Sequence, residues 1–78
     1  MKQVTTLDKL NTGQVGVVIS IEDDGRGNFQ KLAGFHITKG VKIEVLGFSL
    51  GTLMRVRISG GALAISKHEA KLVRVEIL

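Results

Sequence analysis

The sequence contains no cysteine, proline, tryptophan or tyrosine. Without cysteine the chain has neither a disulfide framework nor thiolate ligands for a metal ion, which fits a reducing compartment. No apolar run approaches the roughly 20 residues that a membrane-spanning helix needs, and the N-terminal residues lack the apolar core of a signal peptide. We therefore expect a cytoplasmic protein.

Aromatic side chains are also scarce, since three phenylalanines are the whole set. Domains that bind proline-rich peptides use an aromatic groove, and proteins that bind single-stranded nucleic acid stack its bases on aromatic rings. The composition therefore counts against both activities.

The net charge of +4 keeps one alternative open, a small basic β-barrel protein associated with RNA or the ribosome. The lysines and arginines are scattered, however, and only Arg55 and Arg57 form an obvious pair on one face. Binding to nucleic acid would weaken steeply with salt, whereas a contact between apolar patches would weaken little.

The 78 residues predict one domain, residues 1–78. Aliphatic residues alternate with other residues in five segments, which is the period of half-buried strands: 15–21, 41–46, 53–58, 62–65 and 73–77. Five short strands separated by glycine-rich turns predict an all-β fold, a small barrel whose curled sheet protects its edges. The predicted core is Val17, Ile19, Leu32, Ile43, Val45, Val56, Ile58, Leu63, Ile65, Val73 and Val75.

Short helical segments are predicted at three places. Asn28 can cap a helix with three apolar residues on one side, Phe29, Leu32 and Phe35. So short a helix has little stability alone, and we expect it to plug one end of the barrel. Ser66 and Glu69 have the spacing of a capping box, as do residues 5–8, and each predicts a helical turn.

Residues that carry chemistry are few. His36 and His68 are far apart and lack the spacing of metal ligands, so we interpret them as surface residues. The run Glu22-Asp23-Asp24 could hold a hard cation loosely, but it lacks the spacing of a calcium loop, and we interpret it as a solvated hairpin tip. We predict no catalytic, cofactor-binding or metal-ligating residues, no small-molecule substrate and no enzymatic activity.

Several apolar residues lie outside the core alternation or in a turn predicted at residues 47–51. They are Val18, Leu46, Phe48, Leu50 and Leu53. Gathered on one side, they would form an exposed apolar patch of the kind that marks a protein contact, with Arg55 and Arg57 at its rim. The alternative is that they complete a second small core. An exposed patch or strand edge could also pair two copies of the chain.

Four groups of residues stand in a fixed order along nearly the whole chain: Leu7, Leu10 and Gly13; Leu32-Ala33-Gly34-Phe35 followed by Ile37-Thr38-Lys39-Gly40; Ile43-Glu44-Val45-Leu46; and Leu63-Ala64-Ile65 with Glu69-Ala70 and Val73 to Val75. In order and spacing they resemble the FeoA family, small SH3-like barrels of bacterial ferrous iron uptake. The chain departs from this pattern at His36, where glycine is usual, and at Lys39, where proline is frequent. Glycine at a helix exit adopts a positive φ without steric cost, so either His36 adopts it or the exit turn differs.

The resemblance implies an SH3-like barrel without catalytic residues that serves as a cytoplasmic accessory of FeoB, a membrane transporter with a GTP-binding domain. Contact with this transporter would influence its assembly or activity, and the chain would meet the membrane only through that partner. The fold also resembles the C-terminal domain of iron-dependent repressors. No helix-turn-helix precedes the barrel in this sequence, so we do not expect a repressor.

Overall fold

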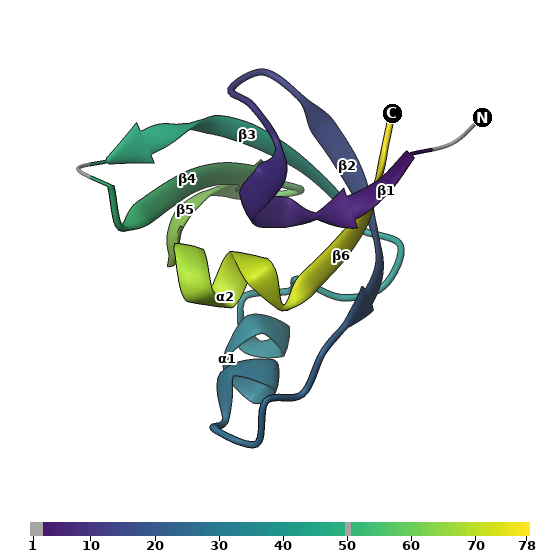
Figure 1. The fold of residues 1–78 in the computed structure, drawn as a ribbon, viewed down its shortest axis with the longest axis vertical. Helices are drawn as coiled ribbons and strands as arrows, with labels where there is room; N and C mark the ends of the chain where they lie inside the picture. The colour runs from purple at the N-terminus through teal and green to yellow at the C-terminus, as the bar shows by residue number, and fades with distance from the viewer. Residues whose placement is uncertain (1–2, 50) are drawn as a thin grey trace.

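The computed structural model describes residues 3–49 and 51–78. These residues form a six-stranded antiparallel sheet in the order β1-β6-β2-β3-β4-β5, which curls into a barrel (Figure 1). The strands are β1 (Gln3–Thr6), β2 (Val15–Ile21), β3 (Lys42–Ser49), β4 (Leu53–Ile58), β5 (Gly61–Ser66) and β6 (Val73–Ile77). A 3-10 turn η1 (Leu7–Lys9) and two short helices, α1 (Asn28–Gly34) and α2 (Lys67–Lys71), complete the fold.

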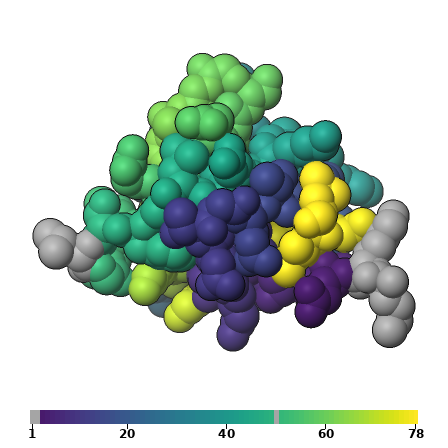
Figure 2. Space-filling view, turned by 90° about the horizontal axis from the view of Figure 1, so that it is seen from above, coloured from purple at the N-terminus to yellow at the C-terminus, as the bar shows by residue number. Residues whose placement is uncertain are grey.

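The sixth strand, β1, is the difference from the predicted five. It carries a single aliphatic residue, Val4, so alternation could not reveal it, and its pairing with β6 defines it instead. The helical turn predicted from residues 5–8 forms as η1, but it starts later than predicted and its N-cap is Thr6, because Thr5 and Thr6 end β1. Figure 2 shows this N-terminal part of the chain (purple) lying beside the C-terminal residues (yellow).

The two helices begin in different ways. Helix α2 has the predicted capping box: the Ser66 hydroxyl accepts from the Glu69 backbone N–H at 3.0 Å, and Glu69 Oε1 accepts from the Ser66 N–H at 2.8 Å. The predicted cap of α1 is wrong. Its N-cap is Gly27, in a left-handed conformation with φ 83°, and the Asn28 amide instead donates to Asp24 at 2.9 Å.

Helix α1 closes one end of the barrel, as predicted (Figure 1). Leu32 is fully buried in the core, whereas Phe29 and Phe35 stay 39% and 37% exposed. Only one of the three apolar residues on this face therefore enters the barrel, and the two rings lie at the surface.

The core follows the prediction except in β2. Seven predicted residues are fully buried, Leu32, Ile43, Val45, Val56, Ile65, Val73 and Val75, and Ile58 and Leu63 pack against them. Val17 and Ile19 are not in this core but half-buried, and Val18 takes their place at 1% exposure. The aliphatic phase of β2, Val15, Val17, Ile19 and Ile21, is only half-buried, whereas Gly16 and Val18 of the other phase are buried. A bulge between Val18 and Ser20 shifts the alternation, so the pattern pointed to the wrong inner face.

The predicted turn at residues 47–51 begins too early, because β3 continues to Ser49. Strand β3 also contains a bulge between Val45 and Gly47.

Within the described ranges, none of the helices has the length and apolar character to cross a membrane.

Candidate partner-binding surface

The predicted apolar patch does not form one surface. Val18 lies in the core opposite Val75, so its expected exposure is wrong. Leu46 is half-buried at the β3 bulge, and Leu50 lies outside the described residues. Phe48 and Leu53 are the predicted apolar members that are exposed, at 43% and 42%.

The register of the β3–β4 hairpin separates these two side chains. Phe48 stands opposite Met54, and Leu53 stands opposite Ser49. Residues directly opposite each other in an antiparallel pair share a face, and neighbours along a strand alternate. Since Met54 is fully buried, Phe48 belongs to the inner face at the rim of the barrel, whereas Leu53 belongs to the outer face.

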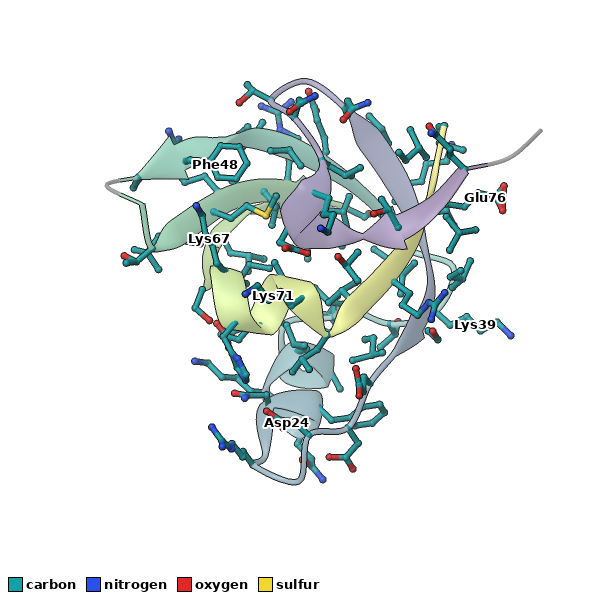
Figure 3. All side chains as sticks on the ribbon, viewed as in Figure 1. Asp24, Lys39, Phe48, Lys67, Lys71 and Glu76 are labelled. Carbon is teal, nitrogen blue, oxygen red and sulfur yellow. The ribbon has the colours of Figure 1, made fainter. Side chains whose placement is uncertain are left out.

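At the rim, Phe48 lies beneath a cation from another element. The ammonium of Lys67, the first residue of α2, is 5.7 Å from the centroid of the Phe48 ring, and Figure 3 shows the two side chains pointing toward one another. A cation in this position interacts favourably with the ring face. Sequence reasoning missed Lys67, because only the fold brings α2 beside the end of β3.

Three predicted residues do share the outer face of β4, namely Leu53, Arg55 and Arg57, which are all exposed and which we call the β4 outer face. Arg57 pairs with Glu44 of β3, its Nη1 lying 3.2 Å from Oε1. Arg55 stands opposite Gly47 on one side and Ala64 on the other, and it forms no ion pair within residues 3–49 and 51–78. This surface therefore combines an exposed leucine with an arginine that no acidic residue of the described chain neutralises.

An ion pair and a contact between an imidazole and a carboxylate join α2 to α1 and the loop before it. Lys31 Nζ lies 3.1 Å from Glu69 Oε2, and His68 Nε2 lies 3.1 Å from Asp24 Oδ2. Burial raises the pKa of Glu69, but hydrogen bonds from Ser66 and the Lys31 ammonium outweigh it and hold this pKa below its usual value. Hydrogen bonds from the Asn28 amide, the Arg26 N–H and the His68 ring lower the pKa of Asp24 to about 2.

His36 lies at the helix exit that the sequence marked as unusual. It has φ 65° and is the only residue other than glycine with a positive φ in the described ranges. Its N–H donates to Ala33 O at 2.9 Å, and the Ile37 N–H donates to Leu32 O at 3.0 Å, the pair of bonds that defines a Schellman motif. The exit turn is therefore the glycine type, with histidine in the left-handed position.

The described residues contain no group of three or more histidine, aspartate or glutamate side chains that could hold a metal ion. An open hollow of about 580 Å³ lies between β2, β3 and β4. Its charged lining includes Glu44 and Arg57, which neutralise each other.

Residues 5–77 match the family model described as the FeoA domain. A crystal structure of an iron uptake regulatory protein (FeoA) is 30% identical, with a TM-score of 0.88 over 97% of this chain and 100% of the other. A FeoA-like protein from Clostridium acetobutylicum is 26% identical, with a TM-score of 0.89 over 100% of this chain and 91% of the other.

A likeness in fold alone extends further. A manganese-dependent transcriptional repressor is 20% identical, with a TM-score of 0.89 over 96% of this chain and 41% of the repressor. A Stenotrophomonas maltophilia FeoA complexed with zinc, described as a prokaryotic SH3 domain protein, is 24% identical, with a TM-score of 0.80 over 91% of this chain and 88% of the other. Comparison with curated proteins returned no match.

Proposed function

The chain belongs to the FeoA domain family, and from this premise we propose that it is an accessory of bacterial ferrous iron transport that binds the membrane transporter FeoB. It acts on the cytoplasmic side, contributes no catalytic residue and meets the membrane through FeoB. The match over residues 5–77 supports the role in iron transport.

The β4 outer face is the feature of the structure that supports a contact with FeoB. Leu53 is 42% exposed beside Arg55, which has no ion-pair partner among the described residues. An exposed leucine costs solvation free energy that a partner would recover, and a nearby arginine orients and steers an acidic partner. We propose that Leu53 and Arg55 form the centre of the contact, with Arg57 and the Phe48 rim at its edge.

A pull-down from solubilised membranes containing FeoB tests this proposal. We expect the wild-type chain to retain FeoB and Leu53→Asp to lose it, because a desolvated carboxylate in an apolar contact is unfavourable. Leu78→Asp is the matched control, since Leu78 is 66% exposed and lies at the end of the chain away from β4. Equal retention of FeoB by both variants, with unchanged circular dichroism, would remove the β4 outer face from the contact.

The same protein preparations also test the alternative that the chain is an RNA-associated basic protein. Each preparation is also titrated with a single-stranded RNA at two salt concentrations. Binding of RNA that falls steeply with salt, together with no retention of FeoB, would favour that alternative over the transporter.

A further inference from the structure

Strand β5 forms one end of the sheet and has an unpaired edge. Among residues 3–49 and 51–78 its only partner strand is β4, with continuous pairing from Leu53↔Ser66 to Ile58↔Gly61. Proteins usually protect such edges with charged side chains, proline or bulges. The sequence of β5, Gly-Ala-Leu-Ala-Ile-Ser, has neither charge nor proline, and its register contains no bulge. The predicted closure of the sheet is thus incomplete at this edge.

The direction of the backbone groups of β5 follows from two hydrogen bonds at its end. Just beyond the strand, the Lys67 N–H donates to Thr52 O, on the β4 side, at 3.1 Å. Hydrogen-bonded and non-hydrogen-bonded residues alternate in an antiparallel ladder, so the N–H groups of Ser66, Ala64 and Ala62 point away from β4. Ser66 agrees with this alternation, because its N–H donates to Glu69 Oε1 at 2.8 Å.

The capping box of α2 thus uses the last donor of the free edge and leaves the two before it. The N–H groups of Ala62 and Ala64 have no hydrogen-bond partner among the described residues, and both alanines are exposed. An extended segment placed beside them would find a donor and an acceptor at each, which is the basis of recognition by strand addition. The light-green residues around position 60, where β5 begins, project from the molecule (Figure 2).

The outer face beside this edge carries two arginines, of which Arg57 is paired with Glu44 and Arg55 has no acidic partner among the described residues. Ala62 stands opposite Arg57, and Ala64 stands opposite Arg55, so these four side chains share the outer face. A strand added to β5 would lie about 10 Å from β4, twice the spacing of neighbouring strands. Alanine is too short to block the space between, so an extended arginine can meet a glutamate side chain of the added strand across it.

We propose that the free edge of β5 binds an extended segment of a partner protein that carries acidic side chains at alternate positions. Its backbone pairs with Ala62 and Ala64, and its acidic side chains lie over the alanines toward Arg55 and toward Arg57 beside its pair with Glu44. Charge complementarity favours this occupant over a second copy, because β5 pairing with β5 would bring the arginines of two chains with net charge +4 toward each other.

The side chains on the other face of the added strand would also find space. An open hollow of about 470 Å³ lies at the start of β5, lined among others by Phe35, His36, Ile58 and Leu63. Apolar side chains of the segment, alternating with the acidic ones, would point to this side. The inference deepens the proposed function, since it states how a protein partner would be held, but its test requires no transporter and can fail independently of the pull-down.

The test is an NMR titration of the 15N-labelled chain with a capped synthetic peptide in which glutamate alternates with valine. We expect the amide resonances of Ala62 and Ala64 to shift and their hydrogen exchange to slow. A peptide with lysine in place of glutamate should change neither the amide resonances nor the hydrogen exchange of Ala62 and Ala64. Ala64→Pro should abolish binding while keeping the fold, because the N–H that it removes does not pair with β4 and proline is tolerated at such a position.

Reversing the charge of Arg55 measures the contribution of this side chain separately from that of the backbone groups of β5. Arg55→Glu should weaken binding of the glutamate peptide by about two- to fivefold, the effect of one exposed ion pair, whereas Arg74→Glu on β6, also exposed, should not. The proposal is overturned if millimolar peptide leaves Ala62 and Ala64 unperturbed, if Ala64→Pro binds equally well, or if both peptides bind alike. Protection of the same amides by rising protein concentration alone would assign the edge to a second copy and overturn the acidic occupant.

Discussion

The backbone N–H of Ile37 donates to the carbonyl of Leu32 at 3.0 Å, and both side chains are fully buried. The bond fixes the exit of α1 so that these two residues enter the core together, which is the apolar contact that accompanies a Schellman motif. The geometry requires a left-handed residue between them, and that residue is His36.

Replacing His36 by glycine should therefore stabilise the chain. A residue with a side chain costs about 1–2 kcal/mol in the left-handed region, and the greater freedom of unfolded glycine offsets about 0.5–1 kcal/mol of the gain. We expect urea denaturation to show a net increase of about 0.5–1 kcal/mol for His36→Gly. A decrease would mean that the imidazole makes a stabilising contact that outweighs the backbone strain.

Replacing Gly16 and Gly34 by alanine should change the stability of the fold in opposite directions. A Cβ on Gly16 would lie 2.9 Å from Val75 Cβ, whereas one on Gly34, at the end of α1, meets no atom within 4 Å. We expect Gly16→Ala to cost about 1–3 kcal/mol by overpacking and Gly34→Ala to gain up to about 1 kcal/mol from helix propensity. Thermal denaturation of both variants measures this, and a tolerated Gly16→Ala would contradict the close contact of β2 and β6.

Glu69 should matter for stability through its two roles in α2. Glu69→Ala removes the acceptor of the Ser66 N–H and the partner of Lys31, and we expect it to cost about 1–3 kcal/mol. Glu69→Gln keeps an acceptor for the cap and should cost less. Chemical denaturation compares the two, with Glu22→Ala in the exposed loop as the control. Equal losses for alanine and glutamine would assign the effect to the charge alone.

Stability should fall on the acid side as Asp24 becomes protonated. Its pKa is lowered from 3.8 to about 2, and a carboxyl with a depressed folded pKa stabilises the fold above its unfolded pKa and loses this contribution as the pH falls through the folded value. We expect the free energy of unfolding to drop between about pH 4 and pH 2. Asp24→Asn should make that drop smaller, and Asp23→Asn in the same loop should not. An unchanged acid profile in Asp24→Asn would contradict this assignment.

The barrel could be predicted from the sequence because most strands have one aliphatic phase, whereas the family was indicated by the resemblance of four residue groups in a fixed order. The strand β4 is the clearest case: Met54 and Val56 are buried while Leu53, Arg55 and Arg57 are exposed. In the strand β2 the phase with four aliphatic residues is only half-buried, so Val18 of the other phase was assigned to the surface although it is buried. Propensity and period cannot reveal a bulge, and the register with β6 decides which side chains of β2 point inward.

The candidate surface could be predicted only in part, for a similar reason. Leu53, Arg55 and Arg57 follow from simple alternation on one strand. Phe48 was grouped with Leu53 because the turn was placed too early, and a shift of one residue in register moves a side chain to the opposite face. The cation over Phe48 comes from Lys67, which is distant in sequence, and no local pattern indicates such a contact.

Calorimetric titration of the chain into purified FeoB in detergent tests the central claim most directly, namely that this barrel acts by contact with the transporter. We predict saturable binding that persists as salt is raised, that Leu53→Asp abolishes and that Leu78→Asp leaves intact. No binding to FeoB by the folded wild-type chain, together with salt-sensitive binding to RNA, would contradict the account.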